Sequence, residues 1–95
     1  MRAYLIVKLK FHDLGWSKEY LASVPAILRQ YGGGYLDRGM KIERFEGNAV
    51  TPNHFTILTF PSLEAIRHFM NSPEYAPFRD ARIAQTESDI LAFET

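Results

Sequence analysis

Arginine, histidine and tyrosine side chains give this sequence its capacity for chemistry, and Arg38 is the first of them to consider. It lies in a stretch of alternating side chains, on the same side of the expected strand as Leu36 and Met40. A guanidinium can hold a carboxylate by two parallel hydrogen bonds, which suits a small acidic ligand. The alternative is a structural ion pair with Glu46 or with a helix carboxylate. Arg38 is therefore a candidate ligand-binding residue.

A second group of candidates consists of Tyr75, Arg79 and Arg82, which are spaced i, i+4 and i+7. This spacing aligns them on one face of a helix. Two arginines on one face repel each other, so an anion should lie nearby. That anion is either a ligand or part of a solvated network of the chain's own carboxylates. The carboxylates in question are Asp80, Glu87 and Glu74.

His54 and Tyr20 are the candidate catalytic residues. Histidine titrates near neutrality and can act as a general base, and His54 begins an expected strand on the same side as Phe60. Tyr20 belongs to an aromatic stripe with Trp16 and Tyr31, which either lines a pocket or packs in the core. Any chemistry would then be cofactor-free proton transfer or oxygenation assisted by His54 or Tyr20.

Metal and phosphate chemistry find little support in the sequence. The three histidines, His12, His54 and His68, form no i, i+4 pair, and the chain has no cysteine, so we expect no metal site and no cofactor. The triple glycine at 32–34 follows a helical pattern and lacks the lysine of a phosphate-binding loop. Neither a Ser-His-Asp arrangement nor a nucleophile-elbow motif is present.

The composition predicts one domain over residues 1–95. Eleven basic residues balance eleven acidic ones, so net charge gives no long-range attraction to nucleic acid or to an anionic membrane. No apolar run approaches the roughly 20 residues needed to span a bilayer. We therefore expect a cytoplasmic protein that binds neither membranes nor nucleic acid.

The first half of the chain is organised around the glycines at 32–34. Residues 3–11 alternate as a strand, and Asp13 is the expected N-cap of a helix over 14–31 with a kink caused by Pro25. The glycines suit a helix C-cap followed by a sharp reversal. A second strand is expected over 35–46, with a bulge at Gly39.

The second half repeats a strand, helix and strand. After a loop over 47–53, a strand is expected at 54–60, followed by a helix that Ser62 caps and that runs to Met70. Ser72 and Pro73 then start a further helix to about Gln85. Residues 88–93 form the last strand.

This order predicts an α+β, ferredoxin-like βαββαβ sandwich, with the helices on one face of an antiparallel sheet. The other face stays uncovered within one chain, although it carries Tyr, Phe, Ile and Leu side chains. A soluble protein rarely leaves so large an apolar surface in water. We therefore expect a homodimer that packs sheet against sheet.

Several runs of the sequence also resemble a known family. They are AYLIV (3–7), YGGGYLDRG (31–39), EG (46–47), FPSLEA (60–65) and NSPEY (71–75), together with Arg79 and Arg82. In order and spacing these runs resemble short bacterial proteins classed as a domain of unknown function in the dimeric α+β barrel superfamily. The resemblance implies ferredoxin-like subunits that pair into a barrel. Relatives in that superfamily include cofactor-free monooxygenases and isomerases, which place ligands between sheet and helices.

Three hypotheses for function follow. The first is a homodimer that binds a small acidic molecule between helices and sheet, with Arg38 as an anchor. The second is a non-catalytic structural or interaction module, which predicts no cavity of ligand size near Arg38. The third is binding of single-stranded RNA by sheet aromatics, which the balanced charge and the lack of a basic, aromatic strand motif make the weakest of the three.

Overall fold

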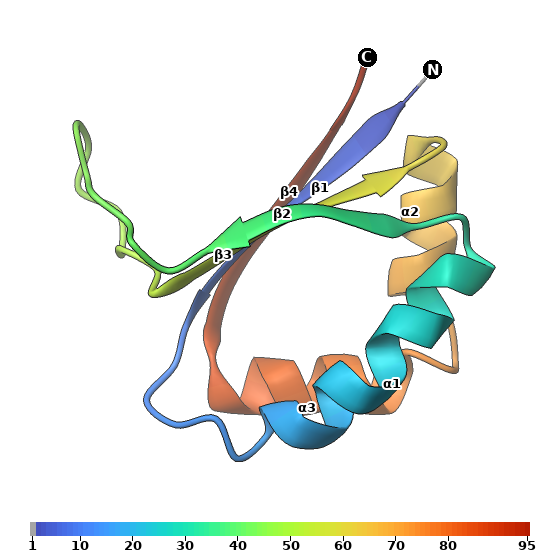
Figure 1. Ribbon diagram of the computed structural model, residues 1–95, viewed down its shortest axis with the longest axis horizontal. Coiled ribbons are helices and arrows are strands. Elements are labelled where there is room, and N and C mark those ends of the chain that lie inside the picture. Colours follow the sequence, from blue (N-terminus) through green and yellow to red (C-terminus); the bar gives the residue numbers. More distant parts are fainter. Residues whose placement is uncertain (1) are drawn as a thin grey trace.

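The computed structural model describes residues 2–95, in which a four-stranded antiparallel sheet carries three helices on one face (Figure 1). Its strands lie in the order β2-β3-β1-β4, which confirms the predicted ferredoxin-like fold, with both α2 and α3 in the second crossover. The elements are β1 (Ala3–Lys10), α1 (Ser17–Gln30), β2 (Gly34–Gly39), β3 (His54–Phe60), α2 (Leu63–Met70), α3 (Ala76–Gln85) and β4 (Glu87–Glu94).

The core lies between the sheet and the helices. Along β1 every second side chain, including Leu5 and Val7, is buried, as the alternating sequence predicts. Leu5 pairs with Leu58 of β3, so both point to the helix side. From the other layer, α1 contributes Val24 and Leu28 to the same cluster. The helix-facing side of the sheet is thus the floor of the core.

The glycine junction has the predicted role. Gly32 has a φ of +82°, and its N–H donates to the carbonyl of Arg29 while the Gly33 N–H donates to that of Leu28. These two bonds form a Schellman motif that ends α1. A methyl group at Gly33 would lie 2.7 Å from the ring of Phe60. Glycine is therefore needed at both positions, once for its backbone angle and once for space.

The helix starts follow the sequence less closely. Ser62 caps α2 as predicted, because its Oγ accepts a hydrogen bond from the Ala65 N–H at 3.1 Å. The prediction for Asp13 was wrong: its carboxylate accepts from the Gly15 N–H at 3.0 Å and forms a turn. Consequently α1 begins only at Ser17 and then continues across Pro25.

The start of the last helix was placed a little too early. Ser72 Oγ accepts from the Tyr75 N–H at 3.2 Å, but this bond closes a turn; the N-cap of α3 is Tyr75, and no side chain caps the helix. Pro73, Glu74 and Tyr75 form this turn, and α3 begins at Ala76. The result is that Tyr75 stands at the entry of α3 and not within it.

The second strand is shorter than predicted and is bulged at another position. Its pairing with β3 ends at Gly39 opposite Phe55, one residue short of His54, where β3 itself begins. The irregularity lies between Tyr35 and Asp37, not at Gly39, and leaves Leu36 as the extra residue. Beyond the bulge the side chains alternate between the two faces again, but the extra residue has changed the face to which each of them points.

Residues 40–53, which we call the arm, project from the ends of β2 and β3 on the side away from the helices (Figure 1). Arg44 holds the arm together by donating hydrogen bonds to the carbonyls of Glu46 and Ala49 and, at 2.8 Å, to Thr51 Oγ1. Gly47 allows the reversal with a φ of +90°. The predicted extension of the strand to Glu46 was therefore wrong.

The side of the sheet that carries no helix, which we call the open face, combines apolar and charged side chains. Lys8 lies opposite Asp89, and Lys10 lies opposite Glu87, where β1 pairs with β4. Such cross-strand charge pairs favour the observed register. The apolar members of the open face are Tyr4, Ile6, Phe55, Ile57, Leu91 and Phe93.

Candidate functional site

A cavity of about 230 Å³ lies between α1 and the helix-facing side of the sheet. Its walls are mainly apolar and include Leu5 and Val7 from β1 and Trp16 and Val24 from α1. Polar groups reach it from the sheet and from two helical segments. Those polar side chains are Ser17, Tyr20, Tyr35, Arg38, His54, Thr56 and Tyr75.

Arg38 lines this cavity from β2, opposite Thr56 of β3. Its side chain is exposed on the other side, so the guanidinium stands where the cavity meets solvent. No acidic group of residues 2–95 lies within ion-pair distance of it. The alternative of an ion pair with Glu46 or a helix carboxylate therefore has no support. The guanidinium is available to an outside anion.

His54 lies on the same side of the sheet as Arg38 and also lines the cavity. Its pKa is lowered from the usual 6.5, first because partial burial disfavours the charged ring and second because Arg38 is nearby. The imidazole is therefore neutral at pH 7. A neutral imidazole beside a cationic anchor has the properties of a general base.

We predict that an NMR titration of His54 gives a midpoint below 6.5, and that Arg38→Gln raises this midpoint without restoring it fully, because burial is the larger cause. Arg67→Gln, an equal charge change at an exposed position of α2, should leave the midpoint of His54 unchanged. The histidine of the unfolded chain has the ordinary, higher pKa, so as the pH drops below 6.5 the unfolded state takes up more protons than the folded state. The contribution of His54 to stability therefore falls as the pH drops below 6.5. An unchanged midpoint in Arg38→Gln would contradict this geometry.

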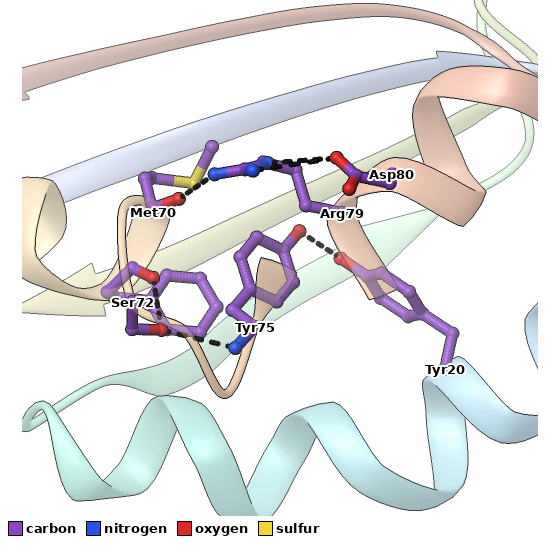
Figure 2. A network of polar contacts seen from close by, with 7 residues as sticks. Tyr20, Met70, Ser72, Tyr75, Arg79 and Asp80 are labelled. Atoms are coloured by element: carbon purple, nitrogen blue, oxygen red, sulfur yellow. Dashed lines mark hydrogen bonds and ion pairs between the residues drawn. The ribbon is translucent and has the colours of Figure 1, made fainter. Parts of the chain in front are cut away.

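Tyr20 and Tyr75 form a pair of hydroxyl groups at the helix end of the cavity. Their oxygens are 2.6 Å apart, and Figure 2 shows Tyr20 reaching from α1 toward Tyr75 beside α3. The pKa of Tyr20 is raised far above its ordinary value, mainly by burial and then by Tyr75. Tyr20 therefore stays protonated and can donate a hydrogen bond, but it is a poor base.

Arg82 does not line the cavity; it lies buried on α3, with 3% of its surface exposed. Its Nε has no hydrogen-bond partner, and no carboxylate within residues 2–95 forms an ion pair with it. Its charge acts on the hydroxyl of Tyr20, whose pKa it lowers against the effect of burial. Within the described part of the chain, the buried Arg82 thus has no ion-pair partner and an unsatisfied Nε, and its charge lies near enough to act on Tyr20.

Arg79 has structural partners and does not line the cavity. Its Nη1 donates to the carbonyl of Met70 at 2.8 Å, and its Nε lies 3.4 Å from the carboxylate of Asp80 (Figure 2). The bond to Met70 joins the end of α2 to α3, whereas Asp80 is the next residue of α3 itself. The Asp80 partner considered from the sequence is therefore present. Of the candidate residues, the structure brings Tyr20, Arg38, His54 and Tyr75 together at the cavity.

The family described as a domain of unknown function (DUF1330) matches residues 2–95. The chain belongs to this family. No curated protein matches the chain. Membership of the DUF1330 family agrees with the resemblance in sequence and assigns no activity.

Solved structures with the same fold are only distantly related in sequence. RPA0582, a protein of unknown function from Rhodopseudomonas palustris, is 14% identical, with 99% of this chain and 82% of that one covered and a TM-score of 0.79. SnoaB, a cofactor-independent oxygenase from Streptomyces nogalater, is 16% identical, with 99% and 92% covered and a TM-score of 0.66. A dimeric ferredoxin-like protein of unknown function from Jannaschia sp. is 16% identical, with both chains fully covered and a TM-score of 0.63.

Sequence reasoning missed Tyr35 and Thr56 as polar lining residues in this DUF1330 chain. Strict alternation put Tyr35 on the opposite side of β2 from Arg38, but the bulge at Leu36 brings both into the cavity lining. Thr56 is an ordinary strand residue in the sequence, and only its pairing with Arg38 reveals its place. Residues 2–95 contain no cluster of histidine and acidic side chains that could hold a metal, and no helix long and apolar enough to cross a bilayer.

Proposed function

We propose that this protein binds a small anionic organic molecule in the cavity between α1 and the sheet. The observation that carries the proposal is that Arg38, which has no ion-pair partner within residues 2–95, lines an otherwise apolar cavity. An apolar pocket with a few convergent polar groups is the usual form of a ligand site. Arg38 anchors the acid group, and the apolar walls hold the rest.

The size of the cavity limits the ligand. At about 230 Å³ it lies below the roughly 300–1,000 Å³ of drug-sized pockets and above the ~150 Å³ that accommodates benzene. Aromatic walls such as Trp16 favour a flat, apolar body. A carboxylic acid with a single aromatic ring therefore meets both requirements.

The polar groups also support a reaction without a cofactor. Neutral His54 removes a proton from an acidic O–H or C–H of the ligand, and its ring nitrogen holds that proton until the next step. The electron pair moves onto an oxygen of the ligand, where the Tyr20 hydroxyl stabilises it. Return of the proton at another atom is isomerisation. In the monooxygenase-like course a C–H carbon of the ligand anion bonds to dioxygen and is itself the reductant: the O–O bond breaks, one oxygen stays on that carbon as a carbonyl, and the other leaves as water with the proton from His54 and the remaining hydrogen of that carbon. The shared fold with the cofactor-independent oxygenase SnoaB supports the second course by analogy.

The same proposal includes a homodimer formed by the open face. Leu91 and Phe93 of β4 are more than half exposed there, beside Ile6 and Tyr4 of β1. Burial of about 600 Å² of apolar surface per subunit contributes on the order of 15 kcal/mol before the costs of association. The Jannaschia relative, which is described as dimeric, supports this assembly. The alternative function, a module that only dimerises, does not call for a cavity beside Arg38.

A binding experiment with Arg38→Gln tests the proposal. We expect benzoate or phenylacetate to stabilise the wild type in a thermal-shift series, and the neutral amide of each acid to do so less. Loss of a charge-assisted hydrogen bond of about 1.5–3 kcal/mol should weaken binding of the acid at least tenfold in Arg38→Gln. Arg67→Gln should behave as the wild type. A wild type that no single-ring acid stabilises would favour the dimerisation module instead.

A further inference from the structure

The arm, residues 40–53, is an ordered loop that its own hydrogen bonds hold in shape. Its centre is fixed by Arg44, which binds the backbone at Glu46 and Ala49 and the hydroxyl of Thr51. Its base is fixed by Asn53, whose amide donates to the carbonyl of Phe11 at 2.7 Å. The backbone of the arm is therefore held in place before any partner arrives, which lowers the entropic cost of association.

The arm displays apolar side chains that the rest of the described chain leaves uncovered. Phe45 is 88% exposed and Val50 is 60% exposed. A preformed loop that presents a bare phenylalanine has the character of an interface anchor, because aromatic side chains, phenylalanine included, are enriched at protein–protein interfaces. The exposure therefore points to a partner that covers the arm.

The arm and the open face enclose a groove of about 590 Å³ that carries both signs of charge. Two of its cations, Lys8 and Lys10, come from the open face, and Arg44 comes from the arm. The anions of the same groove are Glu43, Glu46, Glu87 and Asp89. A surface that meets its own copy across a twofold axis needs both signs, since each residue type faces the other type in the partner.

We infer that the arm holds a second copy of this chain, with Phe45 of each subunit buried against the other subunit. The inference rests on the proposed homodimer and extends it from the open face to the arm, which borders that face through the shared groove. The charge pattern selects a second copy over a partner of one dominant charge. The arm thus decides how tightly the two sheets hold together.

Sedimentation velocity between about 1 and 100 µM protein tests the homodimer and the role of the arm separately. We expect the wild type to be a dimer. Ile83→Asp, a control at an exposed position of α3, should be a dimer as well. Phe45→Asp should weaken dimerisation at least 100-fold, since two anchors are lost for each dimer. Leu91→Asp, on the open face, should also dissociate the dimer.

Each contrary result has a distinct meaning in this experiment. If Leu91→Asp is a monomer while Phe45→Asp remains as tight a dimer as the wild type, the homodimer stands and the role of the arm is refuted. If the wild type is a monomer throughout, both the homodimer and the role of the arm are refuted. Circular dichroism of each variant checks that it is folded.

A second measurement does not depend on disrupting the dimer. Because the chain has no cysteine, Phe45→Cys introduces a single thiol. Its rate of maleimide labelling should fall as the protein concentration rises through the dimerisation range, whereas that of Glu19→Cys, exposed on α1, should stay constant. A labelling rate at position 45 that does not change with concentration would overturn the inference.

Discussion

Replacement of Phe69 by alanine should lower the free energy of unfolding by about 3–5 kcal/mol. The ring is 2% exposed and stacks on Tyr75 with centroids 4.4 Å apart. It also packs against Phe60 at 5.6 Å, so one truncation removes contacts to the sheet and to the α3 entry together. Because a small protein has only about 5–15 kcal/mol of stability, this variant should be close to unfolding at 25 °C.

Urea denaturation at one fixed protein concentration measures this loss, since the stability of the proposed dimer would depend on concentration. Ile83→Ala provides the control, because that side chain is large and apolar but 57% exposed on α3. We expect its effect to stay within about 0.5 kcal/mol. A loss below roughly 1 kcal/mol for Phe69→Ala would mean that the cavity beside it collapses freely.

The replacement of Arg82 by methionine should have the opposite sign and raise the free energy of unfolding by about 1–3 kcal/mol. Methionine keeps the length and apolar character of the arginine stem but removes a buried charge and its unsatisfied Nε donor. A stabilising substitution at a natural residue indicates that the residue is kept for another reason. Here that reason is the charge that acts on Tyr20.

Arg79→Met is the matched control for this prediction. Its guanidinium donates to the carbonyl of Met70 at 2.8 Å, so the same chemical change removes a real bond between α2 and α3. We expect a loss of about 1.5–3 kcal/mol. Both variants are compared by urea denaturation at pH 7, and then titrated with the acid that binds the wild type. If Arg82→Met is less stable than the wild type, the buried guanidinium is satisfied after all.

The order of the elements could be predicted because local signals agree with the global fold. The alternation around Leu5 and Val7, the glycines after α1 and the cap at Ser62 each act within a few residues, and the structure confirms all three. The length of β2 could not be predicted in this way. It depends on where β3 begins to offer hydrogen bonds, which is a property of the pair and not of either segment.

The candidate site was predictable as a set of residue types but not as a geometry. Arg38, His54 and Tyr20 have distinctive chemistry, so the sequence alone identifies them as candidates. The sequence did not show that Arg79 and Arg82 have different surroundings, because both fall on one face of α3 in a simple helical projection. Only the packing decides that one of them bonds to Met70 while the other is buried without a partner.

The bulge at Leu36 also affects how copies of this protein can aggregate. β2 is an outer strand, and the extra residue breaks the regular ladder of amide and carbonyl groups along it. The opposite margin, β4, carries Glu87 and Asp89. Both edge strands therefore resist the edge-to-edge pairing of sheets that leads to fibrils.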